Sequence, residues 1–146
     1  MKKLILFSIV FTVLACSPSL DQKVEKLVSS KDKWVRGSAN KDYTFIYKRN
    51  CICRFSGKNI FIEVRRGKIV RSTIDSKNID PKTLPTIQQL FEFILDNYKE
   101  QQWKEDYPFS VKYSDSLGYP TLIKLDKPGF DRNIEISVSN VKLNGK

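Results

Sequence analysis

The fold is decided by residues 43–74, which read YTFIYKRNCICRFSGKNIFIEVRRGKIVRSTI. Three successive parts of this stretch are predicted to be strands. Side chains alternate between two faces along the first, Ile60, Ile62 and Val64 mark the second, and a turn leads into the third. The three parts are residues 43–55, 60–64 and 68–74. Short turn signals at Ser56-Gly57-Lys58 and Arg66-Gly67 separate them. The stretch therefore predicts three antiparallel strands, with the aromatic side chains of the first on the buried face.

An amphipathic helix is predicted on each side of this meander in the sequence. Ser19 and Gln22 have capping-box spacing, and apolar residues then recur at helical spacing over 20–36 until Gly37 ends the pattern. Thr86 and Gln89 form a second capping box, ahead of a helical apolar stripe. The stripe consists of Ile87, Leu90, Phe91, Ile94, Leu95 and Tyr98. Residues 75–85 are predicted to form a loop.

Three more strands are predicted after the second helix, at residues 109–113, 121–125 and 133–143. The order α-β-β-β-α-β-β-β has no β-α-β alternation, so it predicts an antiparallel α+β fold with the helices on one face. Asp42-Tyr43-Thr44-Phe45 is echoed by Asp106-Tyr107-Pro108-Phe109, which suggests a degenerate tandem repeat. One continuous six-stranded sheet and two separate sheets both remain open.

Length and composition exclude many functions. The chain has 146 residues, three cysteines and no histidine. The absence of histidine excludes Ser-His-Asp and Cys-His catalysis and every imidazole-ligated metal site. The length fits one domain, which we place at residues 21–146.

The N-terminus predicts export. Met1-Lys2-Lys3 is followed by an apolar run that is too short to span a membrane and ends at Ala15-Cys16. The end resembles a bacterial lipobox, so residues 1–15 are expected to be a removed signal peptide. Cys16 is then the lipidated N-terminus, and 16–20 form a short tether to the membrane. The alternative is ordinary cleavage after Ala15, which would leave a soluble secreted protein.

Several motifs in order resemble a known family. They are Trp34, Asp42-Tyr43-Thr44-Phe45, Cys51-Ile52-Cys53, Gly118-Tyr119-Pro120 and Val138-Ser139-Asn140-Val141. Together they are similar to bacterial envelope proteins of the domain of unknown function 6174, over residues 34–143. The resemblance implies small, exported, often lipidated proteins without an assigned activity, and it implies no catalytic residues. Tyr113-Ser114-Asp115 departs from the Tyr-Asp-Pro that the family places there.

Cys51 and Cys53 are the candidate reactive residues. On a regular strand their Cα atoms would lie about 6.5–7 Å apart, so a disulfide between them needs a kink or bulge. The functional interpretation is a redox-active pair in a basic neighbourhood of Lys48, Arg49 and Arg54. A structural disulfide, or two buried thiols, is the favoured alternative because the C-x-x-C spacing of redox enzymes is absent. No metal or cofactor is expected.

A basic surface is the second candidate site. Residues 21–74 carry 14 basic and five acidic side chains, whereas residues 75–146 are nearly neutral. The candidate anion-binding residues are Lys48, Arg54, Arg65, Arg66, Lys68 and Arg71. Export excludes nucleic acid as a partner and leaves anionic lipid or polysaccharide, while a merely solvated face is the alternative.

The sequence as a whole predicts a non-enzymatic binding or structural module anchored in the bacterial cell envelope. Ser17 follows the cysteine in place of the aspartate that retains lipoproteins in the inner membrane, so the outer membrane is favoured where the host has one. Two other functions remain open. One is a thiol-disulfide protein using Cys51 and Cys53, and the other is an inhibitor or assembly factor that binds an envelope protein through an exposed sheet edge.

Overall fold

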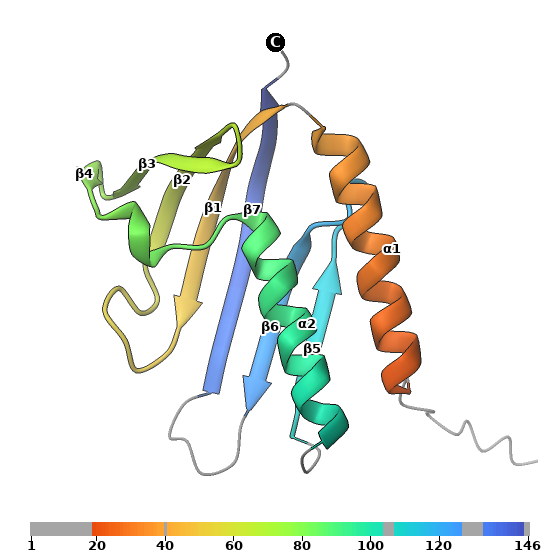
Figure 1. The fold of residues 1–146 in the computed structure, drawn as a ribbon. Helices are drawn as coiled ribbons and strands as arrows, with labels where there is room; N and C mark the ends of the chain where they lie inside the picture. Colours follow the sequence, from red (N-terminus) through yellow and green to blue (C-terminus); the bar gives the residue numbers. More distant parts are fainter. Residues whose placement is uncertain (1–18, 40, 104–106, 127–132, 145–146) are drawn as a thin grey trace, which may run out of the picture.

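The computed structural model describes residues 19–39, 41–103, 107–126 and 133–144. They form one antiparallel sheet of seven strands in the order β4-β3-β2-β1-β7-β6-β5, with both helices on the same face (Figure 1). The helices are α1 (Leu20–Ser38), α2 (Ile87–Trp103) and the short 3-10 helix η1 (Pro81–Thr83). The strands are β1 (Asp42–Asn50), β2 (Asn59–Arg65), β3 (Lys68–Ile74), β4 (Lys77–Asn78), β5 (Phe109–Tyr113), β6 (Pro120–Asp126) and β7 (Asn133–Asn144). The predicted α+β class is confirmed, and the sheet is continuous.

The two halves of the chain meet at the centre of the sheet, where β1 pairs with β7. Pairing runs from Asp42 opposite Asn144 to Asn50 opposite Glu135, with a bulge between Thr44 and Ile46. The first meander occupies one half of the sheet as β3-β2-β1 and the second occupies the other half as β7-β6-β5, so β1 is central and β5 is an edge strand. The suggested tandem repeat stays a prediction.

Both predicted capping boxes are present. Ser19 Oγ accepts a hydrogen bond from the Gln22 N–H at 3.3 Å, and Gln22 Oε1 accepts from the Ser19 N–H at 3.1 Å. Thr86 and Gln89 bond reciprocally in the same way at 2.8 and 3.2 Å. The end predicted for α1 was wrong. Gly37 lies inside the helix, which continues to Ser38, whose hydroxyl donates to the Trp34 carbonyl at 2.7 Å.

The core lies between the helices and the central strands. Trp34 of α1 is 3% exposed, and its ring meets Tyr43 of β1 edge-on at 5.1 Å. The largest fully buried side chains come from both layers: Phe45, Ile62, Val64, Ile87, Leu90, Phe91, Ile94, Pro120 and Ile123. Burial of this apolar area against the helices is what fixes which face of each strand points inward.

The first strand is shorter than predicted, and this changes the surroundings of the cysteines. It ends at Asn50, because residues 51–57 form a turn closed by hydrogen bonds from the Gly57 N–H to the Arg49 carbonyl (2.9 Å) and from the Cys51 N–H to Ser56 Oγ (3.1 Å). Phe55 has a positive φ of 67°, far from the extended backbone of a regular strand. The apolar alternation at positions 51, 53 and 55 therefore did not indicate a strand.

The predicted loop at 75–85 also contains structure. The chain reverses through Asp75 and Ser76, both with positive φ, and forms the two-residue strand β4 and then η1. Asp80 caps η1 by accepting the Lys82 N–H at 2.9 Å. These elements bring residues 78–84 beside the turn that follows β1, as the left side of Figure 1 shows.

The loop before β6 contacts α1 and determines how closely this helix packs on the sheet. Gly118 adopts a φ of +80°, and a Cβ there would overlap the Ser30 carbonyl oxygen of α1. The next residue, Tyr119, packs its ring against Trp34 with centroids 6.1 Å apart. Lys33 donates to the Asp115 carbonyl from the helix side. Gly118-Tyr119 therefore allows α1 to approach the sheet closely.

Candidate functional site

One face of the sheet carries no helix, and we call it the open face. Along β1 the side chains of Tyr43, Phe45 and Tyr47 are buried towards the helices, so Ile46 and Lys48 point the other way. Residues opposite one another in the strand register share a face. The register therefore identifies the rest of the open face.

Cations from both halves of the chain lie on the open face. One cross-strand row runs through Lys112, Leu122, Ser137 and Lys48. A second row runs through Arg71, Glu63, Thr44 and Lys142. Arg65 and Lys68 pair at the end of the β2–β3 hairpin, and Lys124 pairs with Glu135. The β1–β7 pairing thus joins two sets of basic side chains into one surface.

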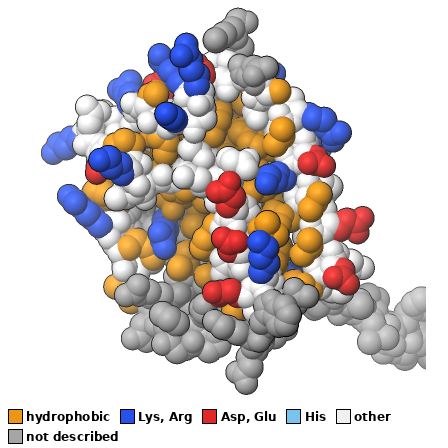
Figure 2. Space-filling view, in the orientation of Figure 1, with side chains coloured by type: hydrophobic (Ala, Val, Ile, Leu, Met, Phe, Trp, Pro, Cys, Tyr) orange, Lys and Arg blue, Asp and Glu red, His pale blue; other side chains and the backbone are white. Residues whose placement is uncertain are grey.

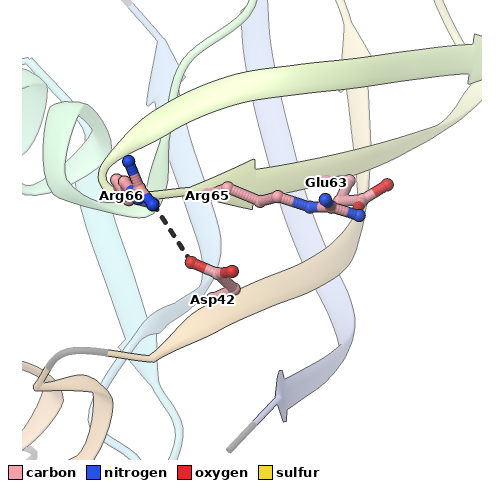
Figure 3. A network of polar contacts seen from close by, with 4 residues as sticks. All are labelled: Asp42, Glu63, Arg65 and Arg66. Atoms are coloured by element: carbon pink, nitrogen blue, oxygen red, sulfur yellow. Dashed lines mark hydrogen bonds and ion pairs between the residues drawn. The ribbon is translucent and has the colours of Figure 1, made fainter. Parts of the chain in front are cut away.

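Two carboxylates on the open face already form ion pairs with neighbouring cations. Glu63 binds Arg65 through both Nε (2.8 Å) and Nη2 (2.6 Å), and Figure 3 shows the two side chains side by side on the hairpin. Glu135 forms an ion pair with Lys124 at 3.0 Å. Within the part of the chain that the structure describes, no ion pair is formed by the remaining cations of the open face. These are Lys48, Lys68, Arg71, Lys112 and Lys142.

Arg66 occupies the tip of the hairpin, away from the open face. Arg66 and Gly67 both have positive φ, 51° and 74°, as a two-residue type I′ turn requires. The Arg66 N–H donates to Asp42 Oδ1 at 3.1 Å, which ties the tip to the start of β1 (Figure 3). Arg66 also lines a pocket with Trp34 and Ser38 at the end of α1, so it belongs to the helix-covered side.

The six cations predicted from the sequence therefore do not form one cluster. The structure places Lys48, Arg65, Lys68 and Arg71 on the open face, whereas Arg66 lies at the hairpin tip and Arg54 in the turn after β1. Figure 2 views the helix-covered side, where Asp and Glu lie over the helices and Lys and Arg gather towards β2, β3 and β4. Sequence analysis missed Lys112, Lys124 and Lys142, because it could not show that β7 pairs with β1.

The cysteines sit in the turn after β1. A disulfide joins Cys51 and Cys53, whose Cα atoms lie 5.3 Å apart. This is closer than a strand would allow, because the turn brings the two residues together. Arg54 follows directly, with its guanidinium 4.9 Å from the Phe55 ring centroid.

Arg49 approaches the same turn from the end of β1, on the face that the helices cover. Burial raises the pKa of the Tyr47 phenol, and the nearby Arg49 guanidinium offsets part of that effect. Among the described residues, no group of three Cys, Asp or Glu side chains is close enough to hold a metal ion. What the turn offers is a disulfide beside two guanidinium groups.

The predicted signal peptide and the lipidation site Cys16 lie outside the described residues. None of the described helices is both long and apolar enough to cross a bilayer.

The comparisons with known proteins agree with the motifs. A family described as a family of unknown function, DUF6174, matches residues 26–143, which is well over half of the chain. No curated protein and no solved structure matches significantly. The match includes the disulfide turn, the β1–β7 centre of the sheet and the Gly118 loop. The chain therefore belongs to the family of unknown function DUF6174.

Proposed function

We propose that this protein is a non-catalytic lipoprotein of the bacterial envelope, anchored through Cys16, whose open face binds the anionic phospholipid headgroups of its own membrane. The observation that carries the proposal is the row pairing across β1 and β7. It places Lys48 in one cross-strand row with Lys112 of β5, and Lys142 in another with Arg71 of β3, on a face that neither helix covers. Where the host has an outer membrane, that is the membrane we favour.

The strength of such binding follows from the number of unpaired cations. Each Lys or Arg near an anionic leaflet contributes about 1 kcal/mol, and the contribution falls within a Debye length of about 10 Å at 0.1 M salt. Four cations of the open face are exposed: Lys68, Arg71, Lys112 and Lys142. Among the described residues none of the four forms an ion pair, so binding to headgroups need not break one first. Arg71 also stacks over Phe61 of the same face, with 6.0 Å between guanidinium carbon and ring centroid.

The position of α1 determines how the domain can reach the membrane. The hairpin tip lies beside the C-terminal end of α1, and a 19-residue helix is about 28 Å long. Cys16 is four residues before Leu20, where α1 starts, so the tether can span at most about 14 Å. The hairpin can therefore reach the same bilayer only when the domain lies flat. A domain that lies on its open face brings the cations of β3, β1, β7 and β5 to the headgroups together, while α1 lies on the other side of the sheet and its tether must reach past the sheet to the bilayer (Figure 1).

Vesicle binding tests this function. Residues 16–146 with Cys16→Ser keep every described residue and should bind vesicles containing phosphatidylglycerol at low salt, but not vesicles of pure phosphatidylcholine. Joint reversal of Lys68, Arg71, Lys112 and Lys142 to Glu should abolish binding. The matched control reverses four exposed cations outside the open face, Lys26, Arg36, Lys82 and Lys99, and should retain most of it. Equal losses in the two variants would show that net charge, and not the open face, drives binding.

A thiol-disulfide function is the second candidate. Cys53 is exposed and lines a pocket together with Arg49 and Arg54, and such an electropositive setting favours a thiolate. The proposed activity is catalysis of insulin reduction by dithiothreitol. Replacement of both cysteines by Ser should abolish that activity, and a wild-type chain that never accelerates insulin reduction would exclude it.

A further inference from the structure

A cavity of about 480 Å³ lies beside the disulfide turn, on the helix-covered side of the sheet. Its volume is within the range of small-molecule sites. Four segments form it: the end of β1, the turn at 53–55, the start of β2 at Ile60, and the chain from Asn78 to Leu84. Its apolar lining comes from Phe55, Ile60, Ile79 and Leu84.

Arg49 gives this cavity its specific chemistry. It lines the cavity from β1, and its Nε is buried without a hydrogen-bond partner in the described part of the chain. A buried donor without a partner is unfavourable, and an acceptor from a ligand would remove that penalty. Nε–H together with a neighbouring Nη–H forms a fork that matches the two oxygens of a carboxylate or phosphate.

The other polar groups of the cavity agree with an anionic ligand. Arg54 adds a second guanidinium, held over the Phe55 ring. Among the described lining residues Asp80 is the single carboxylate, against two guanidinium groups, and its Oδ1 accepts the Lys82 N–H at the start of η1. The charge balance of the lining is therefore positive.

We propose that this cavity binds a small amphipathic anion, whose carboxylate or phosphate head meets Arg49 and Arg54 and whose apolar body packs on Phe55, Ile60 and Leu84. The site is distinct from the open face, because Tyr47 and Arg49 belong to the opposite face of β1 from Lys48. A ligand can therefore occupy it while the open face is bound to a membrane, and neither proposal depends on the other.

Titration of the isotopically labelled chain, residues 16–146 with Cys16→Ser, tests this site by NMR. Octanoate and octyl phosphate should shift the backbone amides of residues 47–57 and 78–84, and the stronger of the two identifies the preferred head group. Octanol, which keeps the apolar body without the charge, should bind at least tenfold more weakly. Arg49→Gln should weaken binding of the preferred anion at least tenfold.

Arg36→Gln, in α1 and outside both the cavity and the open face, is the matched control and should leave the affinity unchanged. If Arg49→Gln prevents folding, Arg54→Gln in the exposed turn decides, with an expected loss of threefold or more. The proposal is overturned if neither anion shifts the amides of these two segments. It is also overturned if octanol binds as well as the anions, or if the folded arginine variant binds as tightly as the control.

Discussion

Asp42 and Arg66 are joined by a hydrogen bond across the end of the sheet, from the Arg66 backbone N–H to Asp42 Oδ1 at 3.1 Å. Arg66 is the first residue of a type I′ turn, and its φ of 51° lies in the left-handed region. The bond to Asp42 holds its backbone in that conformation. Asn is preferred at such a position, and a left-handed non-glycine residue costs about 1–2 kcal/mol. The hairpin therefore carries an arginine where its backbone does not favour one.

Arg66→Asn should stabilise the protein by about 1 kcal/mol, because Asn tolerates the left-handed conformation and its N–H can still donate to Asp42. A gain of that size corresponds to a rise of about 3 °C in Tm. Arg65→Asn is the matched control, since Arg65 lies in β2 and its loss removes the bonds to Glu63. In thermal unfolding the Tm should rise for Arg66→Asn and fall for Arg65→Asn. A lower Tm for Arg66→Asn would contradict the strain argument.

Gly118→Ala should destabilise the protein by about 3 kcal/mol or more. The added Cβ carries the cost of a left-handed φ and also overlaps the Ser30 carbonyl, so α1 must move away from the sheet. Gly67→Ala separates these two effects. Its φ is +74° but nothing lies within 4 Å of the new Cβ, so it should cost only about 1 kcal/mol. Denaturant unfolding measures both, and equal losses would mean that the contact with α1 is unimportant.

Alkaline stability should depend on Tyr43. Burial raises the pKa of Tyr43 to about 12 from its ordinary 10.0, against a smaller opposite effect of a backbone hydrogen bond at Ile87. The folded state therefore holds the proton more tightly than the unfolded state does. The resulting stability is complete below pH 10 and is lost as the pH rises towards 12, at about 1.4 kcal/mol per pH unit.

Tyr43→Phe removes this titration. We expect the free energy of unfolding to fall less steeply between pH 10 and 12 in the variant, although buried Tyr47 and Tyr98, whose pKa values are also raised, keep some slope. Between pH 7 and 9 the difference between the two chains should be constant, which serves as the internal control. Parallel curves up to pH 12 would show that Tyr43 does not titrate with folding.

Much of the fold could be predicted because its signals are local. Capping boxes, the stripe of α2 and the alternation in β2 each depend on neighbours within a few residues, and all are present. The order of strands in the sheet could not be predicted, since pairing of β1 with β7 joins residues about ninety positions apart. The composition of the open face depends on that pairing, so only its first half was recognised.

The prediction of the first strand failed at its C-terminal end, because apolar residues at alternate positions can occur in a turn as well as in a strand. Cys51, Cys53 and Phe55 continue the alternation of β1, yet they lie in a turn. Two hydrogen bonds close the turn and end the strand. The Gly57 N–H donates to the Arg49 carbonyl, and the Cys51 N–H donates to the Ser56 hydroxyl. Arg49 was noted only as a positive neighbour of the cysteines, because its buried Nε is visible only in three dimensions.

Loss of the disulfide should weaken binding in the cavity more than it weakens the fold. Cys51 and Cys53 are two residues apart, so the bond closes a very short loop and restricts the unfolded chain little. It does restrict the turn that presents Arg54 and Phe55 to the cavity. Replacement of both cysteines by Ser should therefore lower the free energy of unfolding by no more than about 1–2 kcal/mol, while the affinity for the preferred anion falls at least threefold.

Reduction provides the control for this last prediction, because it breaks the same bond without a substitution. Dithiothreitol should weaken anion binding by the wild-type chain to the level of the double Ser variant, and should have no effect on that variant. Binding that is unchanged after reduction would show that the hydrogen bonds of the turn alone position Arg54 and Phe55. In that case the disulfide would not be needed for anion binding, and insulin reduction would decide whether it has the redox function.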